Sequence, residues 1–323
     1  MGRGCQQNIA HVRPLDGRVL VVVNPAARNG AGERAAAWLR AQAVREGIVD
    51  RTRVVTTEHA GHAAEIARAS AGFDVLIACG GDGTFHEVLQ GLMTLPREDR
   101  SAFGVLPCGN GNDFARTVGA PLTGVEDAWR ALRTARVEPF DVGVCNGEHF
   151  LETLSFGVDA AIALGTQGRR ERTGHQGTRL FLEEGVHQLA HHRDALACTI
   201  EVLDEAGEVV RAIDESVHLI AVQLGPTYGG GFAVCPDASP RDGVFDVCAC
   251  HAPLGFVHAA ALFLLAKGGH HQGFEREFAF LRAPGLRIVF QEEPPAQIDG
   301  EPIHGTVFAI VTIPHALDVL TCR

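Results

Sequence analysis

The stretch CGGDGTFHEVLQGL, from Cys79 to Leu92, decides the fold of this chain. It continues an apolar run, crosses a glycine-rich loop and enters a segment with helical periodicity. A strand, a glycine loop and a helix in this order place free backbone amides at a helix N-terminus, which favours an anion such as phosphate. Asp82 stands inside that loop, although its carboxylate would repel phosphate. The aspartate therefore needs a cation or a proton beside it.

The composition limits what the chain can be. It has 323 residues, of which 46% are hydrophobic and 21% charged, and its formal net charge is −11. This is enough material for two domains, and the acidic balance argues against a nucleic-acid partner, which would need a basic face. Nine cysteines without a C-x-x-C pair indicate reduced thiols. The first residues lack the apolar core of a secretion signal, so we expect a cytoplasmic protein.

The order of expected elements divides the chain near residue 136. Before it, strands alternate with helices, which predicts an α/β domain with a largely parallel sheet over residues 1–136. After it, strand-like runs follow one another and Asn146-Gly147 gives a hairpin turn signal, so residues 137–323 should form a β-rich domain. Helices are expected there at 178–192 and 254–267. The apolar run 252–266 is too short to span a bilayer and predicts a buried helix.

Three polar glycine loops follow strands of the first domain. Their sequences are NPAARNGAGE (24–33), GGDGT (80–84) and LPCGNGND (106–113). In a parallel sheet such loops meet at the carboxyl edge, where ligands bind. The loops are neither a P-loop, since the only lysine is Lys267, nor a dinucleotide fingerprint. Asp82 would hold a Mg²⁺ that bridges phosphates or accept a hydroxyl proton, and both predict phosphoryl transfer. The alternative is an aspartate that only caps the following helix.

A resemblance narrows this prediction. NPAARNG, GGDGTFHEVLQGL, LPCGNGNDFAR, GGGFAVCPDASPRDGVFDV and QIDGEPI resemble, in that order, the motifs of the bacterial diacylglycerol kinase-like lipid kinases, which share a catalytic domain with sphingosine and ceramide kinases. The resemblance implies a nucleotide-binding domain, a β-sandwich domain for the lipid substrate, and ATP in the cleft between them. It also implies transfer of the γ-phosphate to the hydroxyl of a diacylglycerol-like lipid, with transient contact to a membrane surface.

The same resemblance assigns residues. Glu301 matches the base of the bacterial enzymes, and Asp82 matches the aspartate credited in sphingosine kinases, so both are candidates. Asn110 stands where Thr or Ser is usual. The SPRDGVFD loop matches a structural Mg²⁺ site with ligands Ser239, Asp242 and Val244. The implied nucleotide contacts are Asn24, Pro25, Ala26, Ala27, Arg28, Thr57, Gly81, Asp82, Gly83, Thr84, Phe85, His86, Glu87 and Asn110.

Two departures from the pattern concern the acceptor side. Leu224 and Glu152 stand where the family usually has asparagine. They leave two other functions open: a soluble kinase of the same superfamily that acts on NAD or a small polyol, and a nucleotide-binding regulatory protein without turnover. The segment 168–193 is rich in basic residues and is either a surface for anionic lipid headgroups or a solvated helix.

Overall fold

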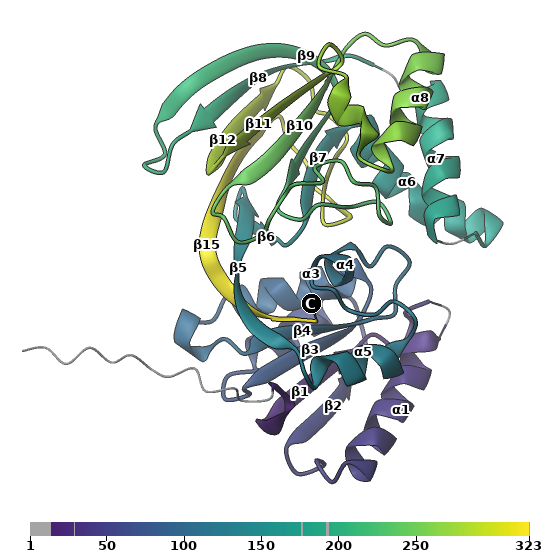
Figure 1. Cartoon of the computed structure of the whole chain (residues 1–323), viewed down its shortest axis with the longest axis vertical. Helices are drawn as coiled ribbons and strands as arrows, with labels where there is room; N and C mark the ends of the chain where they lie inside the picture. The colour runs from purple at the N-terminus through teal and green to yellow at the C-terminus, as the bar shows by residue number, and fades with distance from the viewer. Residues whose placement is uncertain (1–13, 29, 176, 192–193, 323) are drawn as a thin grey trace, which may run out of the picture.

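The computed structural model describes residues 14–28, 30–175, 177–191 and 194–322. Two domains lie one above the other, and the long strands β5 (Arg136–Cys145) and β15 (Val307–Thr321) run between them (Figure 1). The expected boundary between residues 136 and 137 falls at the start of β5.

The N-terminal domain is the predicted α/β unit. Its strands are parallel and lie in the order β2-β1-β3-β4, and the apolar runs of β1, β3 and β4 are buried from both faces. The strands are β1 (Val19–Val23), β2 (Thr52–Thr56), β3 (Val75–Gly80) and β4 (Ala102–Pro107). The helices are α1 (Ala31–Arg45), α2 (His62–Arg68), α3 (Asp82–Met93), α4 (Asp113–Thr117) and α5 (Val125–Leu132), and short 3-10 turns cover Pro14–Asp16 and Arg97–Asp99.

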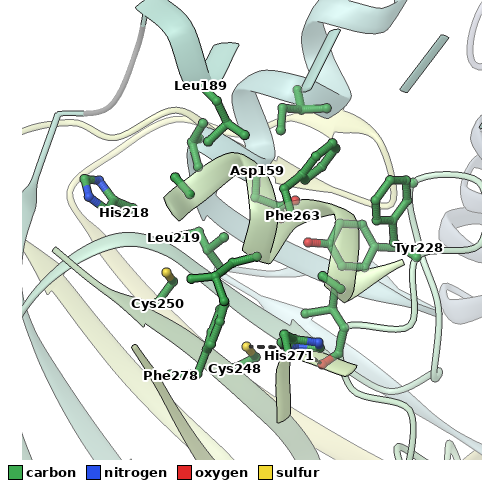
Figure 2. Close-up of a pocket in the computed structure, with 18 of the residues that line it drawn as sticks. Asp159, Leu189, His218, Leu219, Tyr228, Cys248, Cys250, Phe263, His271 and Phe278 are labelled. Carbon is green, nitrogen blue, oxygen red and sulfur yellow. Dashed lines mark hydrogen bonds between the residues drawn. The ribbon is translucent and has the colours of Figure 1, made fainter. Parts of the chain in front are cut away.

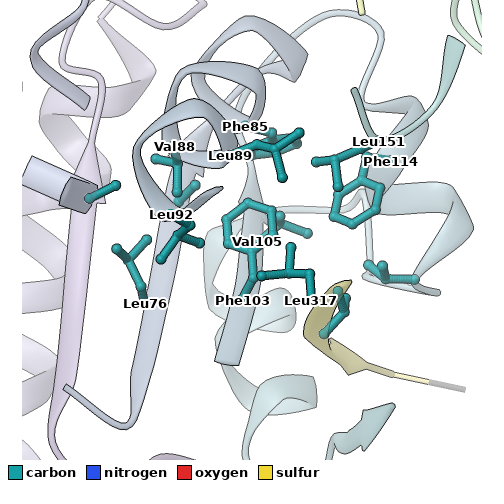
Figure 3. Close-up of a cluster of buried hydrophobic side chains, with 14 of the residues drawn as sticks. Leu76, Phe85, Val88, Leu89, Leu92, Phe103, Val105, Phe114, Leu151 and Leu317 are labelled. Atoms are coloured by element: carbon teal, nitrogen blue, oxygen red, sulfur yellow. The ribbon is translucent and has the colours of Figure 1, made fainter. Parts of the chain in front are cut away.

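A cluster of aromatic and aliphatic side chains fills the space between the sheet and α3 (Figure 3). Phe114 stacks on Phe103 with ring centroids 5.8 Å apart and meets Phe140 edge to face at 6.2 Å. Leu317 of β15 and Leu151 of the second domain belong to the same cluster. The end of the chain is therefore part of the first domain's core.

The C-terminal domain is a β-sandwich-like unit of antiparallel strands, as predicted. Its main sheet runs β14-β13-β7-β9-β8-β12-β15, and β10 and β11 extend from β9. The remaining strands are β6 (Glu148–Phe150), β7 (Thr153–Gly157), β8 (Leu196–Leu203), β9 (Val209–Gln223), β10 (Phe245–His251), β11 (Phe278–Ala283), β12 (Gly285–Phe290), β13 (Ala296–Ile298) and β14 (Glu301–Pro302).

Three helices stand together beside this sheet (Figure 1): α6 (Val158–Thr173), α7 (Gly177–His191) and α8 (Phe256–Ala266), with a 3-10 turn at His270–Gly273. Helices α7 and α8 match the expected positions, whereas α6 was not predicted. Helix α8 also differs from expectation. Its sequence predicts a buried helix, but Val257 is 80% and Leu264 is 59% exposed. Within the described ranges, no helix is long and apolar enough to cross a membrane.

Strand β15 fixes how the domains sit relative to each other. It pairs with β12 and β5 of the second domain and touches β4 of the first, where Val319 lies opposite Phe103. Near its end, the amide of Cys322 donates to the carbonyl of Val118 at 2.8 Å. The carboxyl edge of the parallel sheet therefore faces the second domain across a defined cleft.

Candidate active site

The cleft between the domains holds about 1120 Å³ of open space. On the side of the first domain it is lined by the three glycine loops. On the side of the second domain it is lined by the turn that contains Asp299 and Glu301 and by parts of α6 and α7. This is the meeting of loops that the sequence predicts for the carboxyl edge of the sheet.

Glycine is required where two of these loops touch. A Cβ atom on Gly109 would lie 2.4 Å from the Cα of Gly81, which is closer than real Cβ contacts come. The Asn24 side chain joins the first loop to α3, because its Nδ2 donates to Thr84 Oγ1 at 3.3 Å while its Oδ1 accepts the amide of Ala26 at 3.0 Å. The three loops therefore form one rigid cradle with backbone amides at helix N-termini.

Asp82 connects two loops. Its carboxylate accepts the amide of Asn112 at 2.6 Å and that of Asp113 at 2.9 Å, at the start of α4. Burial and the neighbouring Asp113 carboxylate raise the pKa of Asp82 to about 7, against the lowering effect of the two amides. Helix α3 begins at Asp82 itself, so the aspartate caps α4 and not its own helix.

Two further buried carboxylates accept backbone amides, Asp113 from the second domain and Asp299 from its own domain. Asp113 accepts the amides of Gly230 and Gly231 at 2.8 and 2.9 Å, which ties α4 to the GGG turn of the second domain. Asp299 accepts three consecutive amides from the segment 151–153 at distances of 2.8 to 3.1 Å. These aspartates stabilise the geometry of the site. Neither aspartate was predicted as a site residue, although Asp113 lies in the motif GNGND and Asp299 in IDGE.

His86 forms an ionic contact between the domains. It is 4% exposed, and its Nε2 lies 3.1 Å from Glu148 while its Nδ1 lies 3.4 Å from Asp299. Burial lowers the pKa of His86, but the two carboxylates outweigh that effect and raise it to about 9. The ring is not part of the cleft lining, so this expected nucleotide contact lies behind the cradle.

A pH dependence follows from this contact. Because the pKa of His86 is raised from 6.5 to about 9, its stabilising effect is full below pH 6.5 and is lost as the pH rises through about 9. The difference in free energy of unfolding between wild type and His86→Gln should be larger at pH 6 than at pH 10, by up to about 3 kcal/mol. Urea unfolding at several pH values measures this difference. His304→Gln, a change of an 83% exposed histidine, is the control, and parallel profiles for wild type and His86→Gln would contradict the prediction.

Glu301 differs from Asp82, Asp113 and Asp299, whose carboxylates accept backbone amides. Its side chain is exposed and, among the described residues, makes no hydrogen bond or ion pair. One carboxylate oxygen lies 3.1 Å from the point where a Cβ on Gly83 would stand, so it faces the first turn of α3. Glu301 therefore lies beside the cradle of glycine loops, with its carboxylate exposed.

The other predicted nucleotide contacts divide into two groups. Asn110 lines the cleft, and its buried Oδ1 has no hydrogen-bond partner in the part of the chain that the structure describes. Pro25 and Thr57 are not part of the lining, and the amide of Thr57 donates to Val23 at 2.9 Å. The predicted contacts that do line the cleft are Asn24, Ala26, Ala27, Arg28, Gly81, Asp82, Gly83, Thr84, Phe85, Glu87 and Asn110.

The predicted Mg²⁺ loop lies away from the cleft, before β10. Ser239, Asp242 and Val244 are close in sequence, but the carboxylate of Asp242 forms an ion pair with Arg282 and accepts the amide of Val244 at 3.4 Å. In the part of the chain that the structure describes, no group of three or more His, Cys, Asp or Glu side chains could hold a metal ion. A Mg²⁺ ion on this loop would have to compete with the Arg282 guanidinium.

Glu152, one of the two departures from the family pattern, is 5% exposed and lines the cleft. Neither of its carboxylate oxygens has a hydrogen-bond partner among the described residues. Burial raises its pKa well above the usual value, and the Asp113, Asp299 and Asp82 carboxylates add to this. The raised pKa favours the protonated form of Glu152, which adds no negative charge to the cleft.

Comparisons with known proteins agree with this architecture. Residues 18–145 match the diacylglycerol kinase catalytic domain, and residues 152–321 match the YegS C-terminal NAD kinase beta sandwich-like domain. A crystal structure titled as a diacylglycerol kinase from Bacillus anthracis str. Sterne superposes with a TM-score of 0.71 at 22% identity, covering 95% of this chain and 97% of that one. A second structure from the same strain reaches 0.75 at 21% identity, covering 95% and 98%.

Relatives named "Probable lipid kinase YegS-like" are similar over most of their length. The protein from Pseudomonas aeruginosa strain UCBPP-PA14 is 30% identical over 251 residues, which cover 77% of each chain. The protein from Yersinia pseudotuberculosis strain IP32953 is 30% identical over 297 residues, which cover 86% of this chain and 88% of that one. With both domains matched in order, the chain belongs to the YegS-like, diacylglycerol kinase-like family of lipid kinases.

Proposed function

We propose that this protein transfers the γ-phosphate of ATP to a hydroxyl of a membrane lipid with a glycerol-like headgroup. The observation that carries the proposal is Glu301, a carboxylate that has no partner among the described residues and faces Gly83 at the N-terminus of α3. A base beside an anion cradle is the arrangement that phosphoryl transfer to an alcohol requires.

The reaction follows from this geometry. The backbone amides of the glycine loops hold the ATP phosphates, and the cleft holds the lipid hydroxyl in line with the γ-phosphorus. Glu301 takes the hydroxyl proton as the new O–P bond forms, and the bond between the γ-phosphorus and the bridging oxygen breaks to release ADP. Mg²⁺ bound to the nucleotide would supply charge neutralisation on the phosphates. Asp82 fits such an ion, because each oxygen uses one lone pair on an amide and keeps another.

Helix α8 supports a lipid as the acceptor. Val257 and Leu264 are seven residues apart and so lie on one face of the helix, and both are largely exposed. The opposite face, with Leu262 and Phe263, lines an apolar pocket of the same domain. The helix contains no acidic residue, and Lys267 follows its last turn. An apolar face without negative charge, next to an apolar pocket, suits contact with an anionic lipid surface.

Adding negative charge to this apolar face of α8 tests the contact with lipid. Changing both Val257 and Leu264 to glutamate should lower binding to phosphatidylglycerol-containing vesicles by about tenfold or more, because two apolar insertions are each worth roughly 1–2 kcal/mol. Sedimentation with vesicles measures it, with Val44→Glu as the control, since Val44 is 67% exposed on α1 of the other domain. ATP affinity should stay unchanged. Unchanged vesicle binding would show that α8 does not contact the membrane.

The basic segment 168–193 contributes less to such a surface than its composition suggests. Arg169 and Arg179 form ion pairs with Glu184 and Glu183, and Leu180 and Leu189 are buried. Arg170, by contrast, lines the cleft, where it can meet a phosphate group.

Three incubations with γ-labelled ATP separate the proposal from its two alternatives. Label in a chloroform-extractable product supports the lipid kinase. Label transferred only to NAD or a polyol, without any lipid, would support the soluble kinase. ATP binding without transfer to any acceptor would support the regulatory protein and contradict the proposal.

A further inference from the structure

Two cysteines lie where the three glycine loops of the first domain meet. Cys79 is the last residue but one of β3, and Cys108 directly follows β4. Their Sγ atoms are 3.9 Å apart, in the hydrophobic cluster on the α1 side of the sheet. The carbonyl of Cys79 accepts the amide of Asn24 at 3.0 Å, and the amide of Cys108 donates to the carbonyl of Gly80 at 2.6 Å. The pair is therefore bonded to all three loops.

The two thiols are not equivalent. Cys79 is fully buried, whereas Cys108 keeps 6% of its surface exposed and precedes Gly109, which lines the cleft. The Cys79 thiol donates a hydrogen bond to the Sγ of Cys108. This bond and the Arg28 and Arg34 guanidiniums lower the pKa of the Cys108 thiol against the effect of burial, and the same bond raises the pKa of Cys79. Because the thiolate is the form that reacts with oxidants, Cys108 is the attacking group.

Two cysteines of the second domain show the contrast. Cys248 and Cys250 line the apolar pocket between the sheet and helices α6, α7 and α8 (Figure 2). Burial raises the pKa of both thiols, that of Cys250 to about 12. Thiols in such surroundings stay protonated and pack as small apolar groups. The pair beside the cleft therefore has a reactivity that its position in a hydrophobic cluster does not by itself indicate.

With the ATP site taken from the proposed function, we propose that Cys79 and Cys108 form a reversible disulfide that weakens ATP binding when a hydroperoxide oxidises the protein. The Cys108 thiolate attacks a peroxide oxygen, the O–O bond breaks, and the oxygen that leaves takes up a proton, so that Cys108 becomes a sulfenic acid. The Cys79 sulfur then attacks the sulfenic sulfur, the S–O bond breaks, and the hydroxyl group leaves as water with the proton of Cys79. The two thiols lose two electrons, which reduce the peroxide.

The disulfide changes the third loop because of where its two ends lie. The bond is about 2 Å long, so the sulfurs must come together from 3.9 Å. Cys79 belongs to a strand that is paired with β1 and β4 on its two sides, so Cys108 at the start of the loop makes most of the movement. Gly109 already touches the second loop, since a Cβ on it would lie 2.4 Å from the Cα of Gly81. The movement therefore displaces the amides that face the ATP phosphates.

Full-length wild type, first reduced and then treated with hydrogen peroxide, tests this pair. Trypsin cuts at Arg97 and Arg100, so the disulfide would join the peptides 69–97 and 101–116, which mass spectrometry detects. Calorimetric titration should show an ATP affinity at least about tenfold lower after oxidation, because the displaced amides lose their hydrogen bonds to the phosphates. Dithiothreitol should restore the affinity of the same sample, which shows that the fold is intact.

Two variants identify the thiols. Cys79→Ala removes the second thiol and leaves the loop sequence unchanged, so peroxide should produce no joined peptides, and dimedone should label a sulfenic acid on Cys108. Cys322→Ala removes a partly buried thiol near the chain end and should behave as wild type does.

The outcomes separate this inference from the proposed function. If the joined peptides form and ATP affinity stays the same, or if peroxide lowers the affinity without joining them, the disulfide switch is wrong and the kinase is unaffected. If the reduced protein binds ATP but phosphorylates no lipid, the proposed function is wrong, and the effect of oxidation on ATP affinity still supports or overturns the switch. Reduced wild type that binds no ATP would overturn both.

Discussion

Glu301→Gln should lower phosphate transfer by about 10²- to 10⁴-fold, which is the usual contribution of a positioned general base. The glutamine keeps the size and the exposed position of the side chain, but it cannot take the proton of the attacking hydroxyl. ATP affinity should change little, because the glycine loops that hold the phosphates belong to the other domain. Initial rates and calorimetric titration with ATP measure the two quantities separately.

Glu293→Gln is the matched control, because Glu293 is a 55% exposed glutamate of the same domain that pairs with His304 and does not line the cleft. It should retain the activity of wild type. A fully active Glu301→Gln variant would show that another group accepts the proton. Asp82 would then be the remaining candidate of the two.

Asp82→Asn should also lower phosphate transfer, by at least about 10²-fold, but it should affect ATP binding as well. Asp82 accepts two amides at once, from Asn112 and Asp113. An asparagine offers one acceptor oxygen, and its NH₂ group would face the second amide. Leaving that amide unsatisfied costs roughly 1–3 kcal/mol, so the loop 109–113 should shift and ATP should bind more weakly as well.

Circular dichroism should show an intact fold in Asp82→Asn, since the change leaves the hydrophobic core untouched. Asp127→Asn on α5 is the control, because Asp127 is an exposed carboxylate that also accepts hydrogen bonds. Full activity of Asp82→Asn would contradict any essential role. Reduced transfer with unchanged ATP affinity would instead point to Asp82 as a catalytic group and not as the support of the loop.

Local patterns predicted the N-terminal domain correctly, because its strands and helices are short, regular and separated by glycine loops. The three loops could be expected to meet, since parallel strands end at one edge of a sheet. Helix α6 was missed for a local reason: β7 ends at Gly157 and α6 begins at Val158, with no turn sequence between them. Helix α8 is apolar except for His258, so its sequence could not indicate which apolar face remains exposed.

The roles of the carboxylates could not be predicted, because they depend on contacts between distant segments. Asp82 meets amides 30 and 31 residues away, and Asp113 meets amides 117 and 118 residues away. Asp242 pairs with Arg282, 40 residues further along. The sequence identified both Glu301 and Asp82 as candidates, and only the tertiary structure distinguishes the carboxylate that holds amides from the one that holds none.

Phosphate transfer from ATP to a lipid can be followed by incubating wild type and Glu301→Gln with a total lipid extract and ATP labelled in either the γ- or the α-phosphate. Wild type should carry the γ-label, and not the α-label, into a chloroform-soluble phospholipid, and Glu301→Gln should carry almost none. Bound ATP with no label in the lipid fraction of wild type would contradict lipid kinase activity.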